Sequence, residues 1–262
     1  MEDFVSLDPL SEGLNWYQYT ANPIKNIDPT GKYTLQCTRI IQTGKYCTIT
    51  TTTCYDPCTG FTSCRSYYTI NRKYRNDYRR LEKCGITGWA FCTSLESPSV
   101  EGGGDRCNVA QRMGVDSKCL CALAMTEMSF RNLLTDLQDF LCALTGGWTI
   151  GRSPEPTVGC MQISVGTARE CLRKLYKCDQ KLYHQIAPPS SDGELRYKLS
   201  TDCNFSMKIA AACAKVNTDP KCIKNHMTCD NWAKTRWNPS NRKFQDRLKC
   251  MLEEVKNLNI CN

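Results

Sequence analysis

The stretch GVDSKCLCALAMTEMSF, residues 114–130, decides the fold that this sequence predicts. Asp116 or Ser117 can cap the start of a helix, because a short polar side chain accepts a hydrogen bond from the first unpaired backbone amides. The segment then runs to Phe130 without glycine or proline. We therefore predict a short amphipathic helix that carries a glutamate near its C-terminal end.

Glu127 shares one face of this helix with Leu120, Leu123 and Ala124. A carboxyl group held against apolar side chains favours its neutral form, so its pKa rises. The neutral form is the one that a general acid needs near neutral pH. Glu127 is therefore the candidate catalytic acid, and the alternative is a surface glutamate at a frayed helix end.

Helical patterns continue to the end of the chain. Thr167 lies near the start of a segment that reaches Lys177, and Asp202 can cap a later one. Pro239 and Ser240 start a last helix, in which apolar side chains recur at helical spacing at Phe244, Leu248, Met251, Leu252, Val255 and Leu258. The sequence therefore predicts a mainly α fold, with a helical domain over 106–262.

Residues 32–105 have a different character. The β-branched run from Thr48 to Thr53 predicts a strand. The segment SPSVEGGGD, 97–105, is typical of a hinge. Seven cysteines occur at turn-like spacings, at positions 37, 47, 54, 58, 64, 84 and 92. We expect a small disulfide-rich module that contains β-structure, whose role is docking to a cell wall, spacing or simple stabilisation.

Cysteine is the most unusual part of the composition, with 20 in 262 residues. So many thiols predict paired cysteines and an oxidising compartment, although sequence alone does not give the pairing. No apolar run is long enough to span a membrane, and residues 1–30 contain no apolar signal segment. The high cysteine content and the lack of a signal segment are reconciled if the chain is the tail of a larger exported protein.

The formal net charge of +8 predicts an anionic partner. Residues 65–83 hold seven arginines and lysines against two acidic residues, and tyrosines alternate with them. Nucleic-acid binding is one interpretation. The other, which we favour, is a solvated basic face or attraction to anionic polymers of a cell envelope.

Residues 1–31 resemble the end of the Rhs repeat-associated core domain, which precedes the variable C-terminal toxin of polymorphic toxins. The resemblance rests on DPLSEGLNWYQYTANPIKNIDPTG, residues 8–31. It implies self-cleavage near Gly31, next to Lys32. Ser11 stands where the family has Gly, and Lys32 stands where it has an apolar residue.

Four later segments resemble goose-type lysozymes and lytic transglycosylases, in the family's order. The helix at 114–130 is similar to their catalytic helix, and GCMQISVGTAREC, 159–171, to their Gly-Leu-Met-Gln turn. DCNFSMKIAAAC, 202–213, and NWAKTRWNPSN, 231–241, are similar to the two later elements. The resemblance covers about 155 residues and implies a lysozyme-like fold.

This resemblance implies a set of site residues. Glu127 matches the catalytic acid, Met161 and Gln162 match the turn that contacts the sugar, and Trp237 and Asn238 match the Tyr-Asn pair beside the acid. An amide such as Gln162 can donate to and accept from N-acetyl groups. An indole such as Trp237 offers a sugar an apolar platform.

The chain departs from the family pattern around this set. Met128 stands where Ser follows the acid, Cys160 stands for Leu in the turn, and Trp237 stands for Tyr. Pro239 and Ser240 replace Ala-Gly. These departures bear on the substrate more than on the fold.

The reaction type depends on a second carboxylate. An inverting hydrolase needs one roughly 6.5–9.5 Å from the acid to activate water. Asp136, Asp139 and Glu155, in the long loop after the catalytic helix, are candidate water-positioning residues. Lytic transglycosylases instead use one glutamate as acid and then base, with help from the substrate's N-acetyl group. We slightly favour this single-glutamate reaction.

The resulting hypothesis is a secreted antibacterial effector that cleaves the β-1,4 bond between N-acetylmuramic acid and N-acetylglucosamine in peptidoglycan. We expect a monomer with no cofactor, no metal and no nucleic-acid partner, neutralised by a cognate immunity protein. Cys222, His226 and Cys229 offer metal-ligand spacing, but disulfides are the favoured interpretation. A chitin-directed glycosidase and an inactive glycan-binding module remain alternatives.

Overall fold

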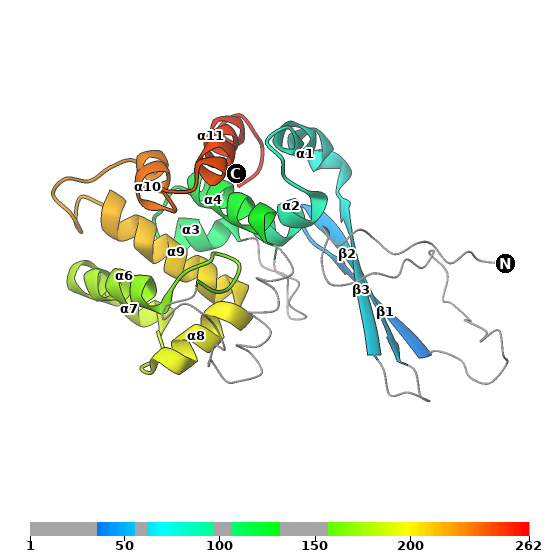
Figure 1. Ribbon diagram of the computed structural model, residues 1–262, viewed down its shortest axis with the longest axis horizontal. Coiled ribbons are helices and arrows are strands. Elements are labelled where there is room, and N and C mark those ends of the chain that lie inside the picture. Colours follow the sequence, from blue (N-terminus) through cyan, green and yellow to red (C-terminus); the bar gives the residue numbers. More distant parts are fainter. Residues whose placement is uncertain (1–35, 56–61, 97–105, 132–156, 262) are drawn as a thin grey trace.

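The computed structural model describes residues 36–55, 62–96, 106–131 and 157–261. Within these ranges the chain is mainly helical, with one small sheet (Figure 1). The strands are β1 Gln36–Thr43, β2 Cys47–Tyr55 and β3 Thr62–Ile70. The helices are the 3-10 turn η1 Arg72–Tyr74, then α1 Arg75–Glu82, α2 Gly88–Leu95, α3 Cys107–Arg112, α4 Ser117–Phe130, α6 Val165–Cys178, α7 Gln180–Ile186, α8 Asp192–Thr201, α9 Cys203–Thr218, α10 Cys229–Arg236 and α11 Arg242–Val255.

The three strands form an antiparallel sheet in the order β1-β2-β3. The predicted strand from Thr48 to Thr53 lies inside β2, the central strand, which confirms that prediction. Cys37 and Cys54 are partners in the register and form a disulfide across β1 and β2. Figure 1 shows the far end of the sheet pointing away from the helices, so only its near end contributes to the core.

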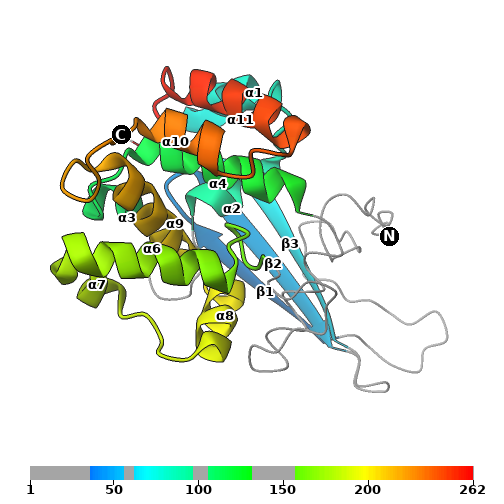
Figure 2. The same ribbon diagram turned by 60° about the vertical axis from the view of Figure 1, so that its left-hand side comes forward.

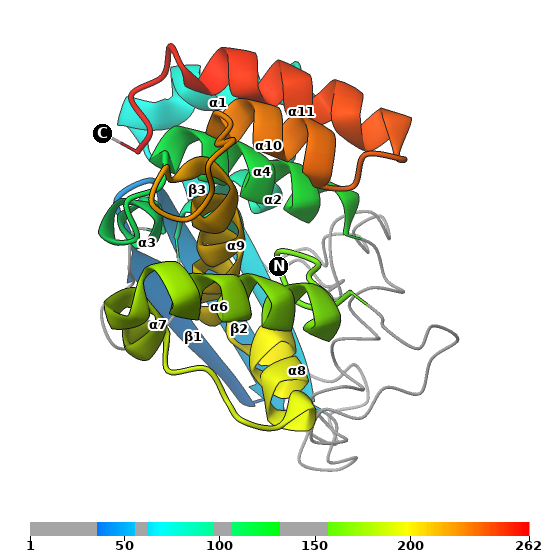
Figure 3. The ribbon, with the colours of Figure 1, turned by 90° about the vertical axis from the view of Figure 1, so that its left-hand side faces the viewer.

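Helix α4 lies at the centre of the helical part. It contacts α2, α3, α9, α10 and α11. Figures 2 and 3 show α10 and α11 on one side of α4, and α6, α7 and α8 on the other. Every side chain from Cys119 to Met128 is consequently buried. The amphipathic character that we predicted is absent, because neighbouring helices cover α4 on nearly all sides.

The predicted helix starts are largely confirmed. The side chain of Asp116 accepts a hydrogen bond from the amide of Cys119 at 3.1 Å, and that of Asp202 accepts from Phe205 at 2.9 Å. The last helix is the exception, because α11 begins after Asn241 rather than at Pro239 or Ser240. The Asn241 side chain accepts from the amide of Phe244 at 3.1 Å and supplies the cap.

Residues before and after position 106 share one core. Helix α2 contacts α4, and α1 contacts α11. Arg80 of α1 forms an ion pair of 2.8 Å with Glu254 of α11. The amide of Asn259 donates to Asp77 at 3.2 Å. The basic segment is therefore anchored to the C-terminal part of the chain by α1, whereas the boundary at 105 stays a prediction.

Eight disulfides link the described residues, which confirms the disulfide-rich character and indicates an oxidising, extracellular setting. Cys222 bonds to Cys178, and Cys229 bonds to Cys119, so the residues with metal-ligand spacing are used as disulfides. None of the helices described is long and apolar enough to cross a membrane. Residues 1–31, with the resemblance to the Rhs core, lie outside the described residues.

Candidate active site

Glu127 lies in the last turns of α4 and is only 5% exposed. The carboxyl group is buried because α10 and α11 pack against this end of the helix. A buried carboxyl group needs a hydrogen-bond donor, since its oxygens lose their contacts with water. The alternative of an exposed glutamate at a frayed helix end is excluded by this burial.

Trp237 supplies the donor. Its Nε1–H donates to Oε1 of Glu127 at 2.5 Å. Trp237 follows directly after α10, and its ring packs edge-on against Trp232 with centroids 5.3 Å apart. The side-chain amide of Gln245 donates to the backbone oxygen of Trp237 at 2.6 Å and fixes the loop. Two residues far apart in sequence, Glu127 and Trp237, are thus brought together.

Burial raises the pKa of Glu127 to about 8, and the hydrogen bond from Trp237 offsets part of that rise. The carboxyl group is therefore neutral at pH 7. Because the indole N–H can only donate, Oε1 is the acceptor, and no hydrogen bond to Oε2 is seen among the described residues.

A pocket of about 470 Å³ opens beside this carboxyl group. Its wall is formed by the end of α4, the turn before α6 with the first turn of α6, and the loop after α10. The lining residues are Glu127, Phe130, Arg131, Thr157, Gln162, Ile163, Ser164, Thr167, Arg236, Trp237 and Asn238. Three of the four substrate-contacting residues that we predicted therefore lie on the wall with Glu127.

Comparison with known proteins adds no family to this geometry: no family model, no curated protein and no solved structure matches the chain. The arrangement of side chains around the pocket is therefore the basis for any functional assignment.

Met161 is the predicted site residue that the structure places elsewhere. Its side chain is fully buried in the core and does not line the pocket. The turn explains why, because Val158 and Ile163 pair as an isolated bridge and direct Met161 inward while Gln162 lies at the wall. The side chain of Met161 therefore packs in the core, away from the pocket wall where the sequence placed it, and its contact with a sugar stays a prediction.

Gln162 holds the turn as well as lining the pocket. Its amide nitrogen donates to the backbone oxygen of Gly159 at 2.7 Å, and its amide oxygen accepts from Thr157 at 3.2 Å. Gly159 has a φ of +75°, and a Cβ there would lie 1.8 Å from the backbone oxygen of Leu199. Only glycine fits at that position, because helix α8 approaches the turn so closely.

Asn238 adopts a φ of +47°, a conformation that asparagine tolerates better than most residues. Its backbone oxygen accepts from the amide of Asn241 at 3.2 Å, which links the loop to the start of α11. The side chain lies at the pocket wall. Trp237 and Asn238, consecutive residues in this loop, both line the pocket.

Other lining residues were missed by sequence reasoning. Arg131 and Arg236 bring two guanidinium groups to the wall, and Ser164 and Thr167 bring two hydroxyl groups. Their position in the sequence could have indicated them, since each lies within a few residues of a predicted site residue or of a predicted helix end. Asp136, Asp139 and Glu155, the candidate water-positioning residues, lie outside the described residues.

The raised pKa of Glu127 predicts how stability depends on pH. In the unfolded chain this carboxyl group ionises near pH 4.5, whereas in the folded chain it ionises near pH 8. Between those values the unfolded state binds fewer protons, so Glu127 lowers the free energy of unfolding progressively as pH rises from 4.5 to 8. Glu127→Gln should therefore unfold like the wild type at pH 4 but at a higher temperature at pH 8. Thermal unfolding of both proteins across this range checks the prediction. It would be contradicted if the variant and the wild type had the same unfolding midpoint at pH 8 as well as at pH 4.

Proposed function

We propose that this chain is a glycosidase that cleaves the β-1,4 bond between N-acetylmuramic acid and N-acetylglucosamine in peptidoglycan. The observation that carries the proposal is the neutral, buried carboxyl group of Glu127 in the wall of an open pocket. Protonation of a glycosidic oxygen is the first requirement for breaking such a bond, and a carboxyl group with a raised pKa meets it near neutral pH.

In the proposed reaction, Oε2 of Glu127 gives its proton to the departing glycosidic oxygen. The carboxylate that forms keeps the hydrogen bond from Nε1 of Trp237, which favours the charged form. Glu127 then takes a proton back, either from water or from a hydroxyl group of the sugar. Water gives a reducing end, whereas the sugar hydroxyl gives an anhydro end; we favour the second, which needs only one carboxylate.

The charge of the pocket favours peptidoglycan over chitin. Arg131 and Arg236 line it, and Glu127 is the one acidic residue among the described lining residues. Peptidoglycan carries carboxylate groups on its lactyl and peptide substituents, whereas chitin is uncharged. Two arginines among the lining residues therefore suit an anionic glycan, since arginine binds carboxylates through paired hydrogen bonds.

We also propose that the helical part is a member of the lysozyme-like superfamily and serves as the toxin of an Rhs-type protein. The order of the four resembling segments supports this, as does the convergence of Glu127, Gln162, Trp237 and Asn238 on one pocket. The family's Ser after the acid is absent. The hydroxyl group of Ser129, two residues after the acid, donates to the backbone oxygen of Thr126 at 2.7 Å and accepts from Arg247 at 2.8 Å. Any contact with an acetamido group must therefore come from another residue, such as Thr167.

Mass spectrometry of the products released from purified peptidoglycan tests the proposal. We expect muropeptides with anhydro ends. Reducing ends would show a hydrolase with a second carboxylate, and release of product from chitin oligomers alone would show the wrong substrate. Tight binding to peptidoglycan without product would contradict the enzymatic proposal and favour a glycan-binding module.

Trp237→Phe should change the pH profile of this activity in a defined direction. Loss of the N–H donor removes the interaction that lowers the pKa of Glu127, so that pKa rises further. The alkaline limb of the kcat/KM profile should therefore move to higher pH. Trp232→Phe is the matched control, because Trp232 contacts the Trp237 ring without lining the pocket. If the alkaline limb of Trp237→Phe stayed at the wild-type pH, Trp237 would not be the group that lowers the pKa of the catalytic acid.

A further inference from the structure

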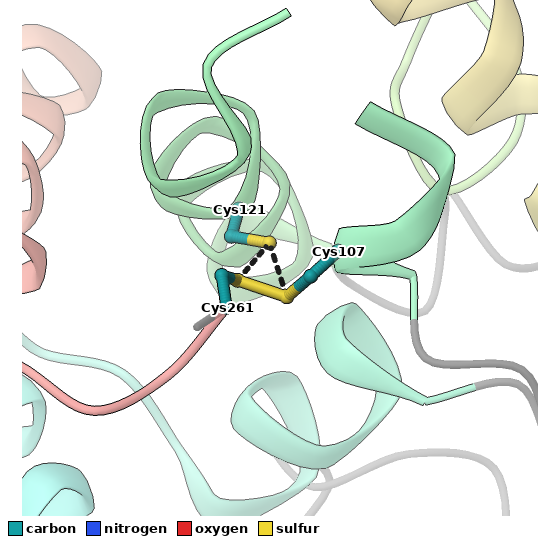
Figure 4. A group of neighbouring side chains, drawn as sticks. All are labelled: Cys107, Cys121 and Cys261. Carbon is teal, nitrogen blue, oxygen red and sulfur yellow. Dashed lines mark hydrogen bonds between the residues drawn. A yellow bond between two sulfur atoms is a disulfide. The ribbon is translucent and has the colours of Figure 1, made fainter. Parts of the chain in front are cut away.

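Three sulfur atoms lie together in the core, away from the pocket. Cys107 of α3 and Cys261 near the chain's end form a disulfide. The Sγ atom of Cys121 in α4 lies 3.1 Å from that of Cys107 and 2.8 Å from that of Cys261. Figure 4 shows all three side chains converging on one point. Cys121 takes part in none of the eight described disulfides, and its sulfur contacts both sulfurs of this bridge.

The end of the chain is held beside this cluster by contacts that do not depend on the bridge. The amide of Cys261 donates to the hydroxyl group of Tyr46 at 3.1 Å. The backbone oxygen of Cys261 accepts from Gln111 at 3.5 Å and from Ser117 at 3.4 Å. Cys261 therefore stays within reach of both α3 and α4 if its disulfide changes partner.

A buried positive charge lies next to the cluster. Arg106 is 3% exposed, donates to the backbone oxygen of Thr93, and has no hydrogen-bond partner for its Nε within the described ranges. Burial lowers the pKa of Arg106 to about 10, so the group remains charged at pH 7, and its electrostatic interaction with Cys121 opposes the lowering. The thiolate is the nucleophile in disulfide exchange, and Arg106 is a cation that interacts electrostatically with Cys121.

We propose that Cys107, Cys121 and Cys261 form a thiol–disulfide exchange site at which one bridge moves between two helices. The thiolate of Cys121 attacks Sγ of Cys261, a Cys121–Cys261 bond forms, the Cys107–Cys261 bond breaks, and Cys107 leaves as the thiolate. No external oxidant or reductant is consumed. The sulfurs form a triangle, so rotation of the Cys121 side chain must first bring its sulfur into line with the bridge.

Exchange moves the covalent anchor of the chain's end from α3 to α4, the helix that carries Glu127. A metal site built from the same three cysteines fits the oxidised chain less well. Two of the three sulfurs are bonded to each other, which leaves one thiolate where a structural zinc ion takes four ligands.

Disulfide mapping of the full-length oxidised chain tests the proposal. The protein is quenched in acid, blocked with N-ethylmaleimide and digested with pepsin without reduction. In the wild type we expect two linked peptide pairs, Cys107–Cys261 and Cys121–Cys261, with the label divided between Cys121 and Cys107. In Cys107→Ser we expect Cys121 to bond to Cys261, so that neither carries label.

Cys203→Ser is the matched control. It leaves Cys160 without its disulfide partner, and among the described residues no third cysteine sulfur contacts this pair. Cys160 should then be fully labelled, which also shows that bridges do not scramble during digestion. The proposal is overturned if the wild type contains only the Cys107–Cys261 pair, or if Cys121 is bonded to Cys142. It is also overturned if Cys121 and Cys261 are both labelled in Cys107→Ser, or if the wild type holds stoichiometric zinc on three thiolates. Should Cys107→Ser fail to fold, the wild-type map decides alone.

Discussion

Glu127→Gln is expected to slow glycan cleavage by about 10²–10⁴-fold, the usual contribution of a positioned general acid. Glutamine has the same shape and accepts the hydrogen bond from Trp237 through its oxygen, but it has no acidic proton to give. The fold should therefore persist while the chemistry is lost. Release of soluble muropeptides from purified cell walls, followed by chromatography, measures the rate.

A surface glutamate provides the control for this experiment. Glu170 of α6 has a side chain that is 57% exposed, pairs with Lys174 and does not line the pocket. Glu170→Gln should cleave cell walls at the wild-type rate. If Glu127→Gln retains full activity while its circular dichroism matches the wild type, Glu127 is not the acid.

Opening the bridge between Cys84 and Cys250 is expected to cause the largest loss of stability among the eight disulfides of the described residues. These residues are 166 positions apart, and in the chain-entropy model closing such a loop contributes about 5 kcal/mol to the free energy of unfolding. The double variant Cys84→Ser/Cys250→Ser should lose most of that amount, as measured by unfolding in guanidinium chloride.

The hairpin bridge between Cys37 and Cys54 gives the comparison. Its partners are 17 positions apart, for which the same model gives about 3 kcal/mol. Cys37→Ser/Cys54→Ser should therefore be the milder change. A larger loss in the hairpin variant would show that strain or structure in the unfolded chain, rather than loop length, sets the contribution of each bridge.

The parts of the fold that could be predicted are those fixed by local chemistry. Asp116 and Asp202 cap the helices that they were expected to cap, because a carboxylate beside unpaired amides needs no distant partner. The apolar stripe of α11 from Phe244 to Val255 is buried as its spacing predicts. The burial of α4 on nearly all sides could not be predicted, because it depends on the helices that surround it.

The candidate site shows the same division. Glu127 and Trp237 could be paired from a resemblance, yet their hydrogen bond requires the loop after α10 to reach the end of α4. Met161 and Gln162 are adjacent in sequence, but Met161 is buried and Gln162 lies on the pocket wall. The geometry of the turn determines which of the two side chains faces the pocket. The pairing of cysteines was equally out of reach, since it is set by three-dimensional proximity.

The long-range bridges impose an order of events on a chain that is made or threaded from its N-terminal end. Cys84 must wait for Cys250, and Cys107 must wait for Cys261, so neither bond can close until nearly all of the described chain has emerged. Trp237, the donor to Glu127, also arrives late. A partly emerged chain would thus present Glu127 to water, with an ordinary acidity and no pocket around it. Emergence of the segment from Trp237 to Cys261 would therefore be the event that assembles the pocket.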